Sequence, residues 1–215
     1  KLQYFSAILL IVFITSCKAQ HSSVVKENAK LVQVSNEYSF TEGPASDKFG
    51  NVYFTDQPND KIIKWDAANN SLSIFKEPAG RANGLYFDHN DKLLAAADEN
   101  NELWRIDSNG NIDTLITTFE GKKLNGPNDI WVDLSGGIYF TDPYYQREYW
   151  SRTSADIKEK NVYYISPDMK QVSIVAEGLT QPNGIIGTPD GKILYVADIG
   201  DKKTYSFSIQ DDGKL

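Results

Sequence analysis

Short runs of alternating apolar and polar residues occur along most of the chain. Residues 61–66 (KIIKWD) and 71–75 (SLSIF) are two such runs. A period of two places successive side chains on opposite faces of a β-strand, whereas no stretch of useful length shows the 3.6-residue period of an amphipathic helix. The pattern therefore predicts an all-β fold.

Four segments of the chain resemble one another, and each ends in an aspartate. They are residues 42–56, 83–98, 128–142 and 183–198, so the aspartates recur at intervals of 42, 44 and 56 residues. In the third segment, two apolar runs flank the tight turn 133–136 (DLSG), and further strands follow before the next segment. Four short strands in a unit of this length are typical of one blade of a β-propeller.

Residues 31–215 have room for about four blades at this spacing, whereas a propeller closes into a ring. We therefore expect a six-bladed β-propeller, of which this chain carries about four blades. Residues 31–34 (LVQV) are expected to form an outer strand that closes a blade built by chain beyond residue 215. The sequence also begins without Met, which agrees with an incomplete chain.

The first thirty residues are predicted to direct the protein rather than to fold. Residues 1–16 combine a basic start with a short apolar run, as in a secretory signal peptide. Cys17 follows Ile-Thr-Ser and resembles the lipidated cysteine of a bacterial lipobox, although an ordinary signal peptide with a chance cysteine is the alternative. Residues 17–30 are polar and are predicted to be a tether. These features predict a periplasmic or outer-membrane lipoprotein that meets the membrane only through its lipid anchor.

The chain is acidic, with 29 Asp+Glu, 22 Lys+Arg and a formal net charge of −7. Without a basic block, nucleic-acid binding is not expected, because phosphate contacts need clustered Lys or Arg. One Cys excludes an internal disulfide and a thiolate metal site, and the two histidines, His21 and His89, give little support to a zinc hydrolase or a Ser-His-Asp triad. Any chemistry is expected to use carboxylates, amides and hydroxyls, with a hard metal ion.

One polar residue opens the inner strand of each predicted blade. These residues are Glu42, Asn83, Asn128 and Asn183, and their equivalent places in the repeat predict that they meet at one mouth of the channel. A carboxylate with amide oxygens suits Ca²⁺, so Glu42, Asn128 and Asn183 are predicted metal ligands. Asn83 is expected to face substrate. Alternatively, each Asn only shapes the chain locally, because Asn-Gly and Asn-Asp favour turns.

An extra segment follows the third aspartate, at residues 143–150 (PYYQREYW), beside the predicted channel mouth. It holds four aromatic residues in eight. Tyr144, Tyr145 and Arg147 are predicted to contact substrate, because aromatic faces with an Arg suit a small organic ligand. The alternative is a long loop that uses its aromatic residues only to hold itself in place.

Several motifs resemble those of the regucalcin/gluconolactonase family of six-bladed propellers. They are residues 42–44 (EGP), 125–133 (NGPNDIWVD), 137–143 (GIYFTDP), 181–185 (QPNGI) and 194–198 (LYVAD). The resemblance covers roughly residues 36–215. It implies a lactone hydrolase that uses one divalent metal at the channel mouth.

The resemblance also implies roles for individual residues. Glu42, Asn128 and Asn183 would supply three of the protein ligands of the metal, and Asp129 would be the acidic neighbour that orients or shapes the site. The family's remaining ligand, an aspartate at the start of a later blade, has no counterpart before Leu215. In the implied reaction, bound Ca²⁺ polarises the lactone carbonyl, and the missing aspartate or a neighbouring carboxylate accepts a proton from the attacking water. Asp129 is the one catalytic candidate present in this sequence, although it would act first by orienting the site.

Two functions are therefore expected as alternatives. The first is Ca²⁺-dependent hydrolysis of a lactone, such as the sugar lactone gluconolactone. The second is a non-catalytic propeller lipoprotein that binds a sugar or a protein, because one fold can serve many roles. A small-molecule lactone is the partner expected in the first case.

Overall fold

The computed structural model describes residues 25–215 and confirms the all-β prediction. The signal peptide, Cys17 and the first part of the tether lie outside the described residues. The chain divides into two units, and every described strand belongs to the second unit, Glu37–Leu215. A single 3-10 turn, Gln57–Asn59, is the helical structure of the described part, and none of its helices could cross a membrane.

The first two blades are four-stranded antiparallel sheets in which each strand pairs with the next along the chain. The strands of the first blade are β1 (Thr41–Ser46), β2 (Val52–Asp56), β3 (Lys61–Asp66) and β4 (Ser71–Lys76). Those of the second blade are β5 (Ala82–Phe87), β6 (Leu93–Ala97), β7 (Glu102–Ile106) and β8 (Ile112–Ile116). This is the predicted repeat of four short strands.

The third blade also has four strands and the fourth has three within the described chain. Their strands are β11 (Ile130–Val132), β12 (Ile138–Asp142), β13 (Lys160–Ile165), β14 (Val172–Leu179), β15 (Pro182–Gly187), β16 (Ile193–Asp198) and β17 (Lys203–Ser208). Between the second and third blades lies a small hairpin, β9 (Thr118–Phe119) and β10 (Lys122–Lys123), which the sequence analysis did not predict. Glu120 and Gly121, at its turn, both have positive φ angles.

Side chains in the turns fix the register of the inner hairpins. In the third blade, Asp133 Oδ1 accepts hydrogen bonds from the backbone N–H groups of Ser135 (2.8 Å) and Gly137 (2.9 Å). Asp47 and Asp88 hold the corresponding turns of the first and second blades in the same way. An Asp side chain that bonds to nearby N–H groups stabilises a tight turn. The three turn aspartates, Asp47, Asp88 and Asp133, therefore account for the similar hairpins of the first three blades.

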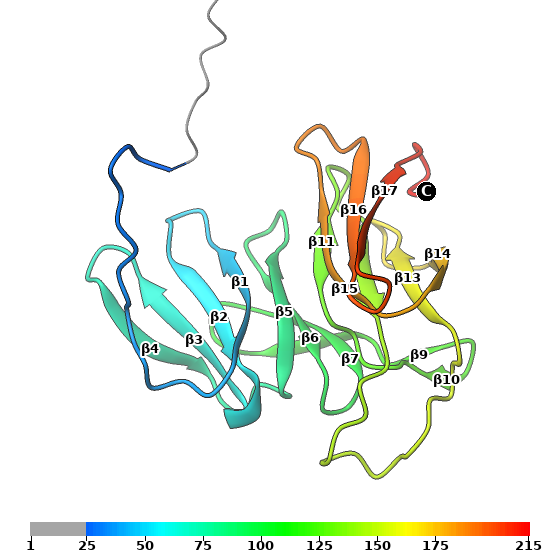
Figure 1. The fold of residues 1–215 in the computed structure, drawn as a ribbon, viewed down its shortest axis with the longest axis horizontal. Coiled ribbons are helices and arrows are strands. Elements are labelled where there is room, and N and C mark those ends of the chain that lie inside the picture. The colour runs from blue at the N-terminus through cyan, green and yellow to red at the C-terminus, as the bar shows by residue number, and fades with distance from the viewer. Residues whose placement is uncertain (1–24) are drawn as a thin grey trace, which may run out of the picture. The chain divides into compact units, whose positions relative to one another are not determined.

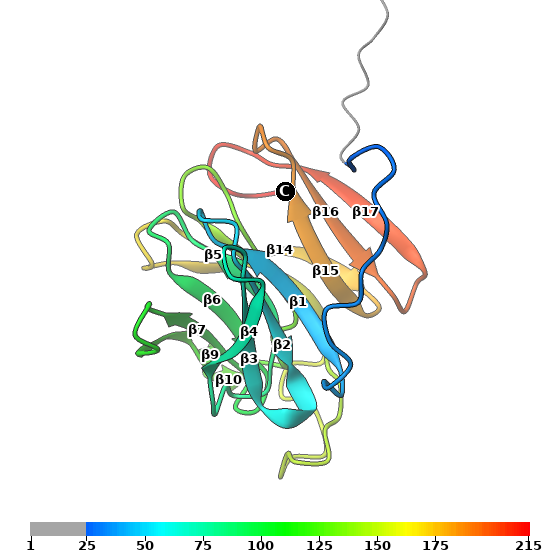
Figure 2. The ribbon, with the colours of Figure 1, turned by 90° about the vertical axis from the view of Figure 1, so that its left-hand side faces the viewer.

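The inner strands of successive blades are neighbours. Strand β1 contacts β5, β5 contacts β11, and β11 contacts β15. Figures 1 and 2 show the blades following one another in chain order, from the blue first blade to the orange-red fourth. The predicted propeller arrangement of four blades is therefore confirmed.

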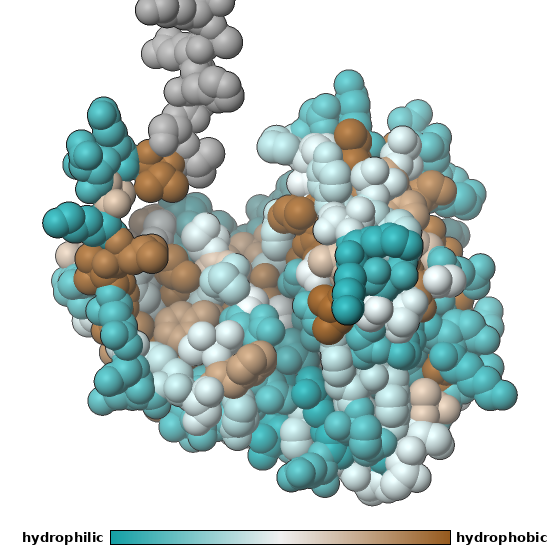
Figure 3. Space-filling view, in the orientation of Figure 1, coloured by the Kyte–Doolittle hydropathy of each residue, from teal (hydrophilic) through white to brown (hydrophobic). Residues whose placement is uncertain are grey.

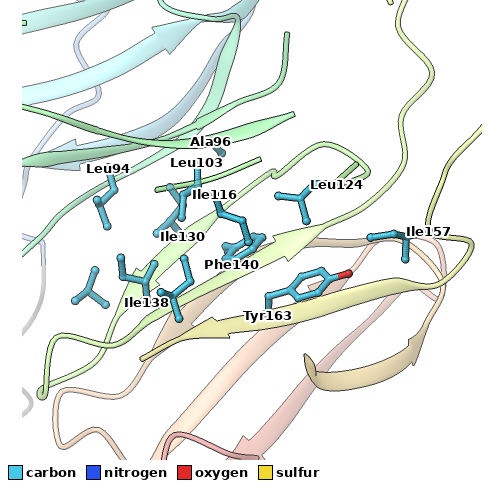
Figure 4. Packing of buried hydrophobic residues seen from close by; sticks show 12 residues of the cluster. Leu94, Ala96, Leu103, Ile116, Leu124, Ile130, Ile138, Phe140, Ile157 and Tyr163 are labelled. Atoms are coloured by element: carbon cyan, nitrogen blue, oxygen red, sulfur yellow. The ribbon is translucent and has the colours of Figure 1, made fainter. Parts of the chain in front are cut away.

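Apolar residues fill the spaces between adjacent blades. One cluster joins the second and third blades and includes Leu94, Leu103, Ile130, Phe140 and Tyr163 (Figure 4). Two further clusters join the first blade to the second and the third blade to the fourth. Burying one large apolar side chain contributes roughly 1.5–3 kcal/mol, so this packing holds the blades, and the ends of their inner strands, in fixed relation.

Two further features are the segment before the first strand and the apolar side chains at the surface. Residues 31–34 form no strand, so the expected closing strand stays a prediction. Some large apolar side chains, among them Phe49, Leu134 and Ile186, are exposed. The lower edge of Figure 3, where the loop between β12 and β13 lies in Figure 1, is covered mainly by hydrophilic and neutral residues.

Candidate functional site

A polar cavity lies where the inner strands begin. It has a volume of about 190 Å³, and its polar lining consists of Glu42, Asn128, Asp129 and Asn183. Glu42 belongs to β1, Asn183 belongs to β15, and the Asn128–Asp129 pair immediately precedes β11. Because the inner strands are neighbours, equivalent positions of the repeat meet here. The structure thus brings together the three predicted metal ligands and Asp129.

The pairing of the inner strands is irregular near these polar residues, which changes the direction of their side chains. The register of the inner hairpins shifts between Glu42 and Ala45, between Ala82 and Leu85, and between Pro182 and Ile185. A β-bulge bends its strand and redirects the side chain at that point. Asn83 and Asn183 lie near the starts of β5 and β15, within these irregular stretches of pairing.

Close backbone contact joins the second and third blades at the cavity. The Gly84 N–H donates to the Asn128 carbonyl oxygen at 2.7 Å. A Cβ at position 84 would lie 2.6 Å from that oxygen and 2.4 Å from Asp129 Oδ1. Only glycine allows this approach, which explains the Asn-Gly pair in the second segment.

Two buried threonines connect neighbouring blades beneath the cavity. The Thr55 hydroxyl lies 3.1 Å from the Glu42 carbonyl oxygen and 3.0 Å from the Asn83 carbonyl oxygen. The Thr141 hydroxyl donates to the Asn183 carbonyl oxygen at 2.6 Å and accepts from the Asp129 N–H at 3.1 Å. The sequence analysis missed both residues, although the repeated Phe-Thr-Asp before the aspartates of the first and third segments was a usable signal.

Asp129 is a buried acid of the cavity, and its surroundings raise its pKa. Its Oδ2 accepts a hydrogen bond from the Ile185 N–H at 2.9 Å, across the boundary between the third and fourth blades. Burial raises the pKa of Asp129 to about 6, and the Glu42 carboxylate adds to the rise, while backbone N–H groups of Ile185 and Ile130 oppose it. Two carboxylates that face one small cavity favour a cation between them.

The loop between β12 and β13 contacts Asn183, a residue of the cavity, through Tyr145. Asn183 Nδ2 lies 3.1 Å from the Tyr145 hydroxyl and donates to it. Since the amide nitrogen is engaged there, the Asn183 side-chain oxygen is left for another ligand. One residue earlier, the Tyr144 carbonyl oxygen accepts from Gln181 Nε2 at 3.1 Å.

Comparison with known protein families identifies the family of the chain. The sequence profile described as the SMP-30/gluconolactonase/LRE-like region matches residues 40–215. The chain belongs to this family. The fold and the resemblance predicted from the sequence are therefore confirmed.

Three known proteins illustrate what the chain is similar to in sequence and in structure. A gluconolactonase of Zymomonas mobilis is 27% identical over 220 residues, which cover 93% of this chain and 61% of the relative. The structure of XC5397 from Xanthomonas campestris, described as a gluconolactonase, superposes with a TM-score of 0.79 at 24% identity, over 85% of this chain and 62% of that one. The structure of a regucalcin from Agrobacterium tumefaciens, described as a calcium-binding protein, superposes with a TM-score of 0.64 at 19% identity, over 82% of this chain and 57% of that one.

These solved structures are less than 25% identical to the chain, so they show its fold alone. The chain spans about three-fifths of the length of the gluconolactonase relatives. What the whole protein does is therefore a matter of proposal.

Some predicted site residues of this family member lie away from the cavity. Asn83 is only 4% exposed and does not line it, and the backbone oxygen of Asn83 binds Thr55 instead. Arg147 directs its Nε to Asp98 Oδ2 at 2.6 Å. Tyr144 packs its ring against Trp150, with a centroid distance of 5.7 Å. Of the predicted substrate-binding residues, Tyr145 is the one whose side chain bonds to a residue of the cavity within the described chain.

The donor set of the cavity fits a hard cation. No group of three or more His, Cys, Asp or Glu side chains in the described part of the chain is arranged to hold a metal. Glu42, Asp129 and the amide oxygens of Asn128 and Asn183 offer oxygen ligands of this mixed kind. Calcium accepts carboxylate and amide oxygens in flexible geometry, so the residues present suit Ca²⁺.

Proposed function

We propose that the protein hydrolyses a lactone at this cavity with the help of a divalent cation, Ca²⁺. The observation that carries the proposal is the convergence of Glu42, Asn128, Asp129 and Asn183 from three blades on one small cavity. Membership of a family whose relatives include gluconolactonases supports lactone hydrolysis. The calcium-binding regucalcin with a similar fold supports the choice of cation.

The residues of the chain divide the work by their chemistry. The Glu42 carboxylate and the amide oxygens of Asn128 and Asn183 would hold the ion. An ion held there would supply Lewis-acid chemistry, through which the lactone carbonyl would be polarised and the negative charge formed on attack by water would be stabilised. The Asp129 carboxylate, whose Oδ2 is held by the Ile185 N–H, would accept a proton from that water. The ring C–O bond then breaks, and the proton passes to the leaving alkoxide, which gives a hydroxy acid.

The polarity of the cavity points to the substrate class. Amide groups and the Tyr145 hydroxyl line or adjoin it, and such groups bind hydroxyl-bearing ligands through directional hydrogen bonds. A sugar lactone such as gluconolactone carries hydroxyl groups around its ring. We therefore propose a sugar lactone as the substrate.

The test uses the full-length protein, with gluconolactone hydrolysis followed by acid release at constant pH. Chelation should abolish hydrolysis, and added Ca²⁺ should restore it. Glu42→Gln, which removes the charged ligand, should reduce kcat/KM by at least about 100-fold, a loss of about 2.7 kcal/mol of transition-state stabilisation. Glu177→Gln, on the exposed outer strand β14, is the matched control and should keep wild-type activity.

Two results would decide against this function. Full activity in the metal-free protein would exclude the role of the cation. Tight sugar or protein binding with no hydrolysis of any lactone would favour the non-catalytic propeller lipoprotein instead.

We also propose that the protein is exported and anchored by lipid at Cys17, with no other contact with the membrane. The apolar run before Cys17 supports this. Labelled fatty acid should enter the wild-type protein but not Cys17→Ser, and the protein should appear in the periplasmic or outer-membrane fraction. Labelling of Cys17→Ser, or a cytoplasmic location, would contradict the proposal.

A further inference from the structure

Asp98 departs from the role that its repeat equivalents share. Asp56, Asp142 and Asp198 each accept two or more backbone N–H hydrogen bonds from the residues that lead into their own blade. None of the hydrogen bonds of the described residues joins a backbone N–H to the Asp98 carboxylate. The residues that lead into the second blade bond instead to Asp60, between β2 and β3 of the first blade, whose Oδ1 accepts from the Ala79 N–H at 3.0 Å and the Arg81 N–H at 2.7 Å.

Asp98 instead binds the loop between β12 and β13. Its Oδ2 accepts from Arg147 Nε at 2.6 Å and from the Tyr149 hydroxyl at 2.8 Å. Its backbone carbonyl accepts from Trp150 Nε1 at 3.0 Å. Asp98 is only 1% exposed, and a carboxylate so deeply buried needs such partners to remain charged. Three side chains of one short segment therefore converge on a single residue of the second blade.

The same segment carries Tyr145 to the cavity. Tyr145 is two residues before Arg147, and the Arg147 guanidinium lies 5.4 Å from the centroid of the Tyr145 ring. The Tyr145 hydroxyl accepts from Asn183 Nδ2 at 3.1 Å. Arg147, which binds Asp98, is thus in direct contact with Tyr145, which binds the predicted metal ligand Asn183.

A second path leads from Asp98 to the residues before Asn128. Asn101 Nδ2 donates to the Asn125 carbonyl oxygen at 3.2 Å, and a Cβ at Gly126 would lie 2.6 Å from Asp98 Oδ1. The chain that delivers Asn128 therefore passes directly over the buried carboxylate. Asp98 is thus linked to both amide ligands of the proposed cation. The link to Asn183 runs through Arg147 and Tyr145, and the link to Asn128 runs through the residues just before it.

We infer that Asp98 and Arg147 are positioning residues, which hold Tyr145 where its hydroxyl fixes the Asn183 amide with the oxygen available to the cation. This inference rests on the proposed function, because it concerns the same cavity. Residues that orient a metal ligand typically change metal affinity by 10–100-fold when removed. Arg147 acts in this way on the site without touching the substrate.

The test measures Ca²⁺ affinity by calorimetry in the full-length protein. Tyr145→Phe removes the acceptor for Asn183 and should weaken binding about 10-fold or more. Asp98→Asn should weaken binding to a similar extent. If Arg147 acts through Tyr145, the Arg147→Gln, Tyr145→Phe double variant should bind no more weakly than Tyr145→Phe alone, since effects that share one route do not add. Glu148→Gln, an exposed carboxylate in the same loop, is the matched control and should bind as the wild type does.

A second measurement follows the loop itself and needs no metal. Trypsin can cut after Arg147 and Arg152, and loss of the anchor in Asp98→Asn should speed cleavage there several-fold, whereas Tyr145→Phe and Glu148→Gln should not. Arg147→Gln replaces Asp98→Asn in the calorimetry if the latter does not fold, as judged by circular dichroism. Wild-type cleavage and wild-type affinity in a folded Asp98→Asn variant would overturn the inference, as would additive effects in the double variant.

The outcomes separate this inference from the proposed function. A wild-type protein that binds Ca²⁺ but hydrolyses no lactone would refute the catalysis, while the affinity differences would still support the positioning role. An active wild type whose Ca²⁺ affinity is unchanged by Asp98→Asn and Tyr145→Phe would refute the positioning role alone.

Discussion

Asp142 shows how strongly single buried residues are perturbed in this propeller. Burial raises its pKa to about 7, and Asp98 adds to the rise, while the N–H groups of Asn125 and Gly126 and the charge of Arg152 oppose it. Both N–H groups donate to the carboxylate at 2.8 Å, so it is well placed but poorly solvated. The folded protein therefore holds a proton on this carboxyl at pH values where an ordinary aspartate has lost it.

This perturbation predicts a pH dependence of stability. Between the ordinary value of 3.8 and about 7, the folded state binds a proton that the unfolded state does not, so the free energy of unfolding falls as the pH rises through this interval. Each unit of elevation is worth about 1.4 kcal/mol. Denaturant unfolding of the wild type and of Asp142→Asn at pH 4.5 and 7.5 measures this, and the wild type should lose more stability than the variant. Equal losses in both proteins would contradict the prediction.

Thr141 predicts a second effect at the level of one residue. Its hydroxyl links the Asn183 carbonyl oxygen to the Asp129 N–H, so Thr141→Val leaves both groups without this partner while preserving shape. Thermal unfolding should show a loss of about 1–3 kcal/mol, with weakened Ca²⁺ binding. Thr114→Val, on the exposed face of β8, is the control and should change neither quantity. An unaltered Thr141→Val variant would show that the link does not matter.

At the scale of elements, the start of each inner strand is the part that the sequence motifs mark most clearly. Bulges occur there in the first, second and fourth blades, and the strands approach so closely that side chains are excluded at particular positions. Gly84 and Gly184 occupy equivalent places after Asn83 and Asn183. Their surroundings nevertheless differ, because a Cβ at Gly184 would meet no atom closer than 3.8 Å.

The difference predicts opposite responses to the same substitution. Gly84→Ala must push apart the second and third blades and should cost about 1–3 kcal/mol in denaturant unfolding, with disturbance of Asn128 and Asp129. Gly184→Ala meets only ordinary contacts and should leave stability close to that of the wild type. Equal stability of the two variants would show that the close approach at Gly84 is not rigid.

At the scale of the whole molecule, the proposed cation would bind residues from the first, third and fourth blades at once. Such a ligand binds the folded protein and not the unfolded chain, so it should raise the unfolding temperature. At a free Ca²⁺ concentration 100 times the Kd, the gain is about 2.7 kcal/mol. Differential scanning calorimetry with chelator and with Ca²⁺ measures it, and Glu42→Gln should abolish most of the shift. A Ca²⁺ shift that persists in full in this variant would place the ion elsewhere.

The sequence by itself determined the repeat, the number of blades in this chain and the residues that begin the inner strands. Those features depend on local alternation, turn residues and equal spacing, all of which are written along the chain. The convergence of Glu42, Asn128 and Asn183 followed from them, because equivalent positions of a ring must meet. The hairpin β9–β10 escaped prediction because its strands are only two residues each.

Only the tertiary structure decided which partner each polar side chain takes. Arg147 finds Asp98, 49 residues away, and Tyr145 finds Asn183, 38 residues away. Such pairs form because packing between blades buries one polar group beside another, and each must then be satisfied. No local pattern carries that information. The sequence therefore marked the loop after Asp142 as a candidate part of the site, and the fold showed that its Arg147 bonds to Asp98 while its Tyr145 bonds to Asn183.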